Sequence, residues 1–192
     1  ALADAVKAAI QILLELALLN DDRKNQGLPE VRIGIGIHHG ETMLGTVGEE
    51  QRMDGTVISD AVNVAARLES LTKKFGASIL VSEDTLQKAE QKAGHSFASR
   101  TLGAIRLRGK KQSMAVVEIL DGLRKAEMQD RLDSAPMILE ATHLMQQKEF
   151  EKARALLDEA ARLYPLDRAP RLLLLRLKKM IQATGFQAES LL

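Results

Sequence analysis

The hydrophobic pattern of this 192-residue chain changes its period near residue 121. Before that point, segments with the 3.6-residue period of helices alternate with short segments of strand character, and glycines stand at the junctions. After a charged segment that ends at Pro136, every remaining segment has helical character. Strands and helices in mixed order form a sheet covered by helices. The pattern therefore predicts an α/β (α+β) domain over 1–121, a linker over 122–135 and a helical tail over 136–192.

The clearest strand signal is the segment VRIGIGIHHG, which follows a helix predicted over 2–20. Four apolar residues recur at every second position and share one face of the predicted strand: Val31, Ile33, Ile35 and Ile37. Gly34 and Gly36 lie on the opposite face, where the lack of a side chain leaves room for another element to pack closely.

Shorter segments complete the predicted domain. ETMLGTVG predicts a strand or a bulged loop, ASILVS predicts a short buried strand, and three further strands are expected near SFASR, AIRLR and MAVVEIL. A helix capped by Ser59 or Asp60 runs to about Lys74. Its buried face is expected to hold four apolar residues: Val62, Ala65, Ala66 and Leu68. A second helix runs from Ser82 to Gly94.

Composition excludes several classes of protein and site. The formal net charge is +1, so no global field would recruit nucleic acid or an anionic membrane, and the lack of Trp argues against base stacking. No cysteine is present, which excludes disulfides and thiolate metal sites and fits a cytoplasmic setting, or a cytoplasmic domain of a membrane-attached protein. The most apolar run, 9–19, is too short for a membrane span. The chain begins inside a helical pattern without an initiator Met, so we expect a missing or cut N-terminus.

The tail has its own signature. Its first helix carries Ala141, with Leu144 one turn later, and Phe150 opens a second helix that Pro165 ends. The second helix carries small and apolar residues at Ala153, Leu157 and Ala160. This arrangement resembles a tetratricopeptide repeat, and a helix at about 168–183 would have to cover it, because one repeat cannot bury its own faces. The alternative is an unrelated helical hairpin that packs on the first domain.

Asn63 and Arg67 are the candidate functional pair. They stand four residues apart in RMDGTVISDAVNVAARLESL and so lie one turn apart on the same side of the predicted helix. Asn is a neutral donor and acceptor, and Arg is a permanent planar cation suited to phosphate. From the residues alone, a polar stripe on a half-exposed helix is favoured over a functional pair. His38 and His39 would point to opposite faces of a strand, so they are poorly placed to share one metal.

The order of four segments changes that assessment. VRIGIGIHHGETMLGTVG, TVISDAVNVAARLESL, ASILVSEDTL and FASRTLGAIRLRGKKQSMAVVEIL together closely resemble the C-terminal half of a class III adenylate/guanylate cyclase catalytic domain over about residues 1–120. Two local departures are Ser59, where the family often has Gly, and His39, where it often has Thr. The resemblance implies a ferredoxin-like domain, a sheet flanked by helices, that is incomplete at its N-terminus in this chain.

The resemblance also implies roles for individual residues. Arg67 would stabilise charge at the α-phosphate in the transition state, and Asn63 would hold the ribose and orient the attacking hydroxyl. Lys110 would neutralise the terminal phosphates, although it could also be a solvent-exposed lysine in a basic turn. Thr56 would accept a hydrogen bond from the exocyclic amine of adenine, which favours ATP over GTP, and the backbone of Val57 would add a contact.

The implied activity is that of an adenylate cyclase, which converts ATP to 3′,5′-cyclic AMP and pyrophosphate in intracellular signalling, in a head-to-tail homodimer with shared sites. The family binds two Mg²⁺ or Mn²⁺ ions per site through Asp residues N-terminal to anything present here. Asp54 and Asp60 match neither ligand, so no metal ligand is expected in this chain and the chain alone should be inactive. The main alternative is a cyclase-like regulatory or nucleotide-binding module without turnover. A weaker third alternative is a helical scaffold for protein interactions, formed mainly by residues 136–183.

Overall fold

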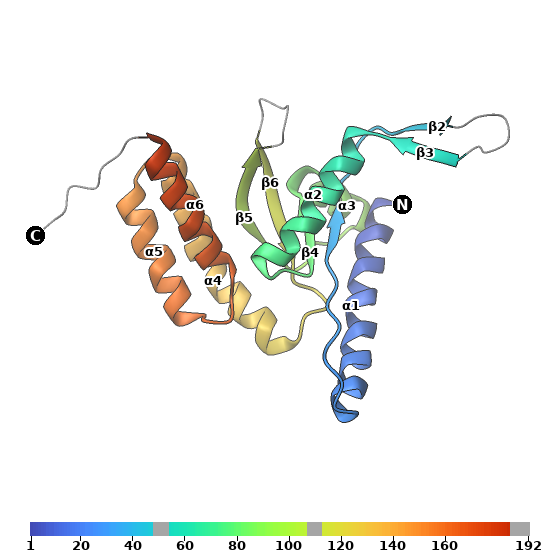
Figure 1. Ribbon diagram of the computed structural model, residues 1–192, viewed down its shortest axis with the longest axis horizontal. Helices are drawn as coiled ribbons and strands as arrows, with labels where there is room; N and C mark the ends of the chain where they lie inside the picture. The colour runs from blue at the N-terminus through green and yellow to red at the C-terminus, as the bar shows by residue number, and fades with distance from the viewer. Residues whose placement is uncertain (48–53, 107–112, 185–192) are drawn as a thin grey trace, which may run out of the picture.

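The computed structural model describes residues 1–47, 54–106 and 113–184 of the chain. Figure 1 shows the helical tail on one side, a small sheet in the middle and the first helix on the other side. The elements follow in the order α1 (Leu2–Asn25), β1 (Ile35–Ile37), β2 (Met43–Val47), β3 (Asp54–Ile58), α2 (Asp60–Phe75), β4 (Ile79–Ser82), α3 (Glu83–Ala93), β5 (Ser99–Arg106), β6 (Ser113–Ile119), α4 (Lys125–Gln146), α5 (Phe150–Leu163) and α6 (Ala169–Thr184).

The main sheet has four strands in the order β1-β4-β6-β5. β1 and β4 are parallel, whereas β4 with β6 and β6 with β5 are antiparallel. β2 and β3 form a separate antiparallel hairpin that extends away from the sheet (Figure 1). The segment ETMLGTVG, expected as a strand or a bulged loop, contains the strand β2. The strand β3 was not expected from the sequence. The mixed α+β class, with helices packed on a sheet, is confirmed.

Helices cover both faces of this sheet. In β4, Ile79 and Val81 join a core with α1 and α3, whereas Leu80 between them joins a second core with α2 and the tail. This division follows from the two-residue period of a strand, which sends successive side chains to opposite faces. A strand that is apolar throughout, as predicted for ASILVS, is therefore buried on both sides.

Two glycines allow α2 to approach the sheet closely. A Cβ atom added to Gly36 would lie 2.2 Å from the carbonyl oxygen of Ala65 and 2.4 Å from the amide nitrogen of Glu69. A Cβ at Gly34 would lie 2.0 Å from the hydroxyl of Thr72. The close packing expected opposite these glycines is thus confirmed, and the packing element is α2.

α1 is longer and β1 is shorter than the sequence predicted. The helix continues to Asn25 because Asn20 does not end it; instead, the Asn20 side chain bonds the returning chain. Its amide donates to the carbonyl of Val31 at 2.9 Å and its oxygen accepts from the Val31 amide at 2.8 Å. Val31 is therefore held beside α1, and only Ile35–Ile37 pairs with β4.

The strands expected near SFASR and AIRLR are one strand, β5. Its pairing with β6 is shifted between Thr101 and Ala104, where three steps along β5 match two steps along β6. Gly103 occupies the left-handed region with φ of 93°, which glycine adopts without strain. This bulge explains the break in the sequence pattern, because the alternation changes phase there.

The segment expected as a linker, 122–135, is mostly helical. α4 begins at Lys125 and runs through Pro136 without ending. Proline lacks an amide hydrogen and leaves the carbonyl four residues earlier, that of Leu132, without its helical donor. Both Leu132 and Pro136 are exposed, so water can reach this turn of the helix.

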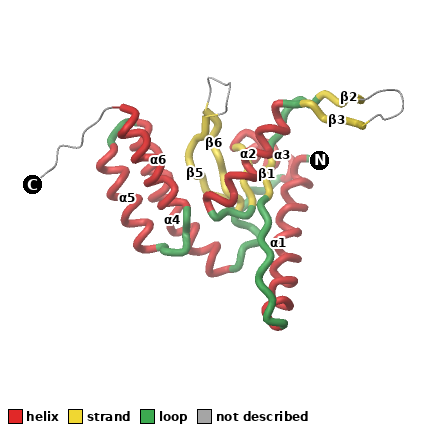
Figure 2. The backbone as a smooth tube through the Cα atoms, viewed as in Figure 1, coloured by secondary structure: helices red, strands yellow, loops and turns green. Residues whose placement is uncertain are grey.

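The tail helices lie together on one side of the sheet (Figure 2): α4 packs on β5, and α5 packs on α4 and α6. The six residues singled out in the first two tail helices are all buried: Ala141, Leu144, Phe150, Ala153, Leu157 and Ala160. α6 begins close to the expected position and contributes Leu173 and Leu177 to the same core as Leu80 of β4. The tail therefore shares its hydrophobic core with the first region. Within the part of the chain that the structure describes, no helix is long and apolar enough to cross a membrane.

Candidate functional site

α2 is the element that carries the predicted catalytic pair. Ser59 caps it: the Ser59 hydroxyl accepts from the amide of Ala61 at 3.0 Å and donates to the carbonyl of Glu41. The buried stripe consists of Ala61, Val64, Leu68, Thr72 and Phe75. The expected buried face was therefore partly wrong, because Val62 is 44% exposed and Ala66 is exposed. α2 packs against Gly34 and Gly36 along a different side from the one we expected.

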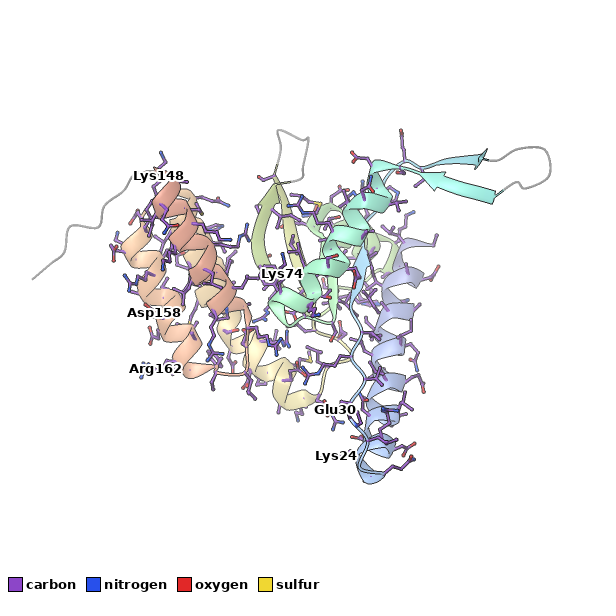
Figure 3. All side chains as sticks on the ribbon, in the orientation of Figure 1. Lys24, Glu30, Lys74, Lys148, Asp158 and Arg162 are labelled. Carbon is purple, nitrogen blue, oxygen red and sulfur yellow. The ribbon has the colours of Figure 1, made fainter. Side chains whose placement is uncertain are left out.

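Asn63 and Arg67 are both exposed, on the side of α2 that faces away from its buried stripe. Four residues of helix rise by about 6 Å, so a single ligand can reach both side chains. Lys74, seven residues after Arg67, lies on the same stripe near the C-terminal end of α2 (Figure 3). The amide of Asn63 and the guanidinium of Arg67 thus stand one turn apart, a pair that is suited to an anionic ligand, and Lys74 lies two turns beyond them.

Thr56 and Val57 lie in β3, directly before α2. In the hairpin register Thr56 pairs with Gly45 and Val57 pairs with Leu44. The structure describes the backbone of this hairpin, and it places the two residues within a few positions of the start of α2. Lys110 lies outside the described residues. Its neighbours in the described chain, Arg106 and Ser113, pair with each other at the ends of β5 and β6.

The two histidines after β1 are held by the start of α3. His38 Nδ1 lies 2.7 Å from the hydroxyl of Ser82, and that hydroxyl lies 2.6 Å from the hydroxyl of Thr85. The backbone amide of His39 donates to the same Thr85 hydroxyl at 2.9 Å. Ser82 and Thr85 are fully buried, so this chain of polar groups ties β1 to β4 and α3.

The carboxylates near α2 form no metal site in the described residues. Asp60 is the first residue of α2, as expected, and Asp54 is the first residue of β3. Across residues 1–47, 54–106 and 113–184, no three His, Cys, Asp or Glu side chains are grouped so that they could hold a metal ion.

A cluster of buried charges lies on the tail side of the sheet, next to the C-terminal end of α2. We call Arg100, Glu118, Arg131 and Asp167 the buried ion cluster. Arg100 donates to Glu118 at 2.7 Å and makes two hydrogen bonds to Asp167, at 2.5 and 3.0 Å. Arg131 donates to the second oxygen of Glu118. The four side chains are at most 6% exposed.

The environment of the buried ion cluster shifts the pKa values of its two carboxyl groups. Burial raises the pKa of Glu118 above its usual value, although the charges of Arg100 and Arg131 oppose this. Burial also acts to raise the pKa of Asp167, but the hydrogen bond and charge of Arg100 outweigh it and the pKa lies below its usual value. The sequence analysis missed this cluster. A signal was present, because Glu118 is a charged residue in the otherwise apolar strand segment MAVVEIL.

A family model described as the adenylate and guanylate cyclase catalytic domain matches residues 2–119. An adenylate cyclase of Anabaena cylindrica is 40% identical over 120 residues, which are 60% of this chain and 24% of that protein. Adenylate cyclase 1 of Rhizobium meliloti is 31% identical over 120 residues, which are 62% of this chain and 17% of that protein. The chain thus spans about a quarter or less of the length of these relatives.

A similar solved structure is the crystal structure of the adenylyl cyclase CyaB from P. aeruginosa. It has a TM-score of 0.51 and 27% sequence identity, and the match covers 65% of this chain and 60% of that one. The match extends over about two thirds of the chain.

Proposed function

This chain belongs to the adenylate and guanylate cyclase catalytic domain family, and on that premise we propose that it is part of a cytoplasmic adenylate cyclase. The protein would convert ATP to 3′,5′-cyclic AMP and pyrophosphate in intracellular signalling. Two relatives that are named adenylate cyclases support ATP as the substrate. The observation that carries the proposal is the pair Asn63 and Arg67, exposed one turn apart on a helix that two glycines hold against the sheet.

The reaction needs positioning and charge stabilisation more than covalent chemistry. The 3′-hydroxyl oxygen of the ribose forms a bond to the α-phosphorus, the bond from that phosphorus to the pyrophosphate oxygen breaks, and the hydroxyl proton is lost to solvent or base. Negative charge builds up on the phosphate oxygens in the transition state, where fixed cations and donors are most effective.

Arg67 and Asn63 have the chemistry for two parts of this step. The guanidinium of Arg67 can donate two parallel hydrogen bonds to the α-phosphate oxygens and stabilise their charge. The amide of Asn63, one turn earlier, can hold the ribose so that its hydroxyl is in line with the bond that breaks. Their spacing on a well-capped helix supports a shared role, because a helix fixes the distance between them.

Three further residues would complete substrate binding in this proposal. Lys110 would neutralise the terminal phosphates, Thr56 would accept from the adenine amine, and the backbone of Val57 would contact the base. One such polar contact is worth about 1–3 kcal/mol, so GTP would be disfavoured rather than excluded. A Thr56→Val variant should accordingly lower the preference for ATP over GTP, measured as the ratio of the two kcat/KM values.

Two further features rest on the family resemblance. Mg²⁺ or Mn²⁺, two per site, would add charge stabilisation through carboxylates outside this chain. The active sites would be shared across a head-to-tail homodimer, in which Asn63 and Arg67 of one subunit complement the metal ligands of the other.

The architecture that we assign to the tail is also a proposal. The buried small residues of α4 and α5, together with the covering helix α6, support a tetratricopeptide-like unit at the C-terminal end of the catalytic region. Its packing on the sheet equally fits a hairpin that is specific to this protein.

Substitution of the catalytic pair in the full-length protein tests the proposed function. Arg67→Ala and Asn63→Ala should each lower kcat by about 100-fold or more with little change in the KM for ATP, as expected for a lost transition-state contact. Lys74→Ala is the matched control, because it removes a cation from the same stripe of α2 two turns away. Near-wild-type turnover in both variants of the pair would reject the assignment. If wild-type protein binds ATP and forms no cyclic AMP, the chain belongs to a binding module instead.

Mixing two inactive variants tests the shared site. An Arg67→Ala subunit and a subunit that lacks a metal-binding carboxylate should each be inactive as homodimers. Heterodimers of the two should regain activity, because one of their two sites then holds every wild-type group. Verified heterodimers that remain inactive would exclude a site shared between subunits.

A further inference from the structure

The C-terminal end of α2 is held by a residue of the tail. α2 ends at Phe75, and the next residue, Gly76, adopts the left-handed conformation with φ of 68° that is common after helices. The carbonyl of Gly76 accepts a hydrogen bond from Arg131 Nη2 of α4 at 2.9 Å. A guanidinium at this position also interacts favourably with the negative end of the helix dipole.

Arg131 is itself fixed on three sides. Its Nη1 donates to Glu118 of β6, and its Nη2 donates to Glu127 in the preceding turn of α4 as well as to Gly76. The Arg131 side chain is only 6% exposed, so solvent competes weakly for these bonds. A planar guanidinium can serve acceptors in several directions at once, which a lysine ammonium on a flexible stem cannot do with the same geometry.

The rest of the buried ion cluster extends this anchor into the sheet and α6. Glu118 also accepts from Arg100 of β5, and Arg100 binds the carboxylate of Asp167. Asp167 in turn accepts from the amide of Ala169, the first residue of α6, at 3.0 Å. The C-terminal end of α2 is therefore joined through charged groups to two strands and two tail helices.

A displacement at this end of α2 would move the predicted catalytic pair, because α2 is one continuous helix and helices are rigid elements. Arg67 lies nine residues before Gly76, or about 14 Å along the helix axis. Gly34 and Gly36 leave room for α2 to lie against β1 near Ala65 and Thr72, so the place of the helix on the sheet is defined by close backbone packing. A misplacement of about 1 Å in a catalytic group can cost up to about 100-fold in rate.

We propose that Arg131 is a positioning residue that sets the place of α2 on the sheet, and through α2 the places of Asn63 and Arg67. This inference rests on the proposed function. It assigns a catalytic contribution to a residue outside 2–119, the part of the chain that matches the family model.

The test compares two variants of full-length protein. Arg131→Lys keeps a charge for Glu118 but cannot also hold Gly76, so kcat should fall about tenfold while the KM for ATP changes less than twofold. Ser134→Ala is the matched control: the Ser134 hydroxyl accepts from Arg100 Nη1 at 2.8 Å and lies 3.0 Å from Asp167 and 3.2 Å from the backbone carbonyl of Arg131, and among the described residues it makes no hydrogen bond to α2. It should leave kcat within twofold. An equal fall in both variants, or no fall in Arg131→Lys, would overturn the proposal. If the Arg131→Lys variant does not fold, Arg131→Gln replaces it, because Gln keeps amide donors but lacks the planar guanidinium.

A double-mutant cycle separates positioning from general damage. If Arg131 acts through the positions of Asn63 and Arg67, Arg131→Lys should lower the residual activity of an Asn63→Ala/Arg67→Ala variant less than twofold, because both groups that it positions are gone. An additive tenfold loss in that background would contradict the proposal.

Hydrogen exchange provides a measurement that does not depend on activity. The amide of Ala77, which bonds the carbonyl of Thr72 at 2.9 Å, and the last turn of α2 should exchange at least fivefold faster in Arg131→Lys than in Ser134→Ala. Unchanged exchange would refute the anchor at Gly76 even if the protein is an active cyclase. If exchange responds as expected and wild-type protein forms no cyclic AMP, only the proposed function fails.

Discussion

The two faces of the central sheet are covered in different ways. On the face that packs against α1 and α3, the core is built from apolar side chains such as Val6, Ile79, Phe97 and Ile119. On the other face, α2 and the tail enclose an apolar core together with the buried ion cluster. β4 and β6 contribute side chains to both faces, so the two kinds of core can be compared along the same strands.

The comparison shows that the covering residues determine where a helix lies on the sheet as well as how stable the fold is. Apolar contacts have no direction, and a helix that slides slightly over them loses little. The buried ion cluster has few satisfactory arrangements, because each charge must keep its partners or incur a large desolvation cost. We therefore expect the tail face to tolerate fewer substitutions, and its helices to be held in a more narrowly defined position, than the face under α1 and α3. The following predictions test that difference.

The largest effect is expected for Glu118→Ala. Loss of this carboxylate leaves Arg100 and Arg131 buried with one partner fewer each, and breaking a buried pair costs about 3–5 kcal/mol. Native-state hydrogen exchange at β6 in the full-length protein measures the loss of opening free energy. Glu118→Gln keeps one acceptor oxygen and should lose less. A loss below about 1 kcal/mol for alanine would show that the cluster contributes little to the stability of this face.

Gly36→Ala should have the next largest effect. The added methyl group would meet the backbone of α2 at Ala65 and Glu69, and backbone cannot rotate away as a side chain can. We expect a cost of about 1–3 kcal/mol, as for other overpacked sites, together with a fall in turnover because α2 must move. Gly94→Ala is the control for a glycine with no neighbour within 4 Å, although its positive φ adds strain. Unchanged turnover in Gly36→Ala would mean that catalysis tolerates a shift of α2.

Ile119→Val tests the apolar face and should have a smaller effect. It removes one methylene group from a fully buried position next to α3 and typically costs about 0.5–1.5 kcal/mol. Turnover should stay near that of wild type, since no charged group depends on this side chain. The measurement is the same exchange experiment at β6. A loss as large as that of Glu118→Ala would remove the distinction between the two faces.

Arg124→Gln should have the smallest effect. Arg124 pairs with Asp21 at the surface, where both side chains are more than half exposed and water and salt screen the interaction. We expect no measurable change in opening free energy or in turnover. If Arg124→Gln clearly lowered the opening free energy, and if added salt made that loss smaller, exposed ion pairs would contribute to stability here as buried ones do.

Local patterns predicted most of the elements but not all of their limits. The glycines opposite α2, the Ser59 cap and the buried residues of the tail follow from side-chain size and period, and all were found as expected. The extension of α1 to Asn25 and the helix through Pro136 were not predicted. Both depend on contacts with distant segments or on exposure to water, which a local pattern does not contain.

The candidate site shows the same division. The spacing of Asn63 and Arg67 placed them on one side of a helix, and the structure has both exposed on α2. The buried ion cluster joins residues at 100, 118, 131 and 167, which no spacing rule connects. Such pairs form only after the strands and helices have packed, so the charges could be noticed in the sequence but their partners could not.

The bulge in β5 also has a genetic consequence. Because of the extra residue between Thr101 and Ala104, Leu102 and Ile105 point to the same core even though they are three positions apart. Loss of the Gly103 codon would restore an uninterrupted alternation and leave every side chain beyond it on the face that it already occupies, because Ala104 would still pair with Ala115. An in-frame deletion of this one residue would thus remove the bulge without exchanging buried and exposed residues.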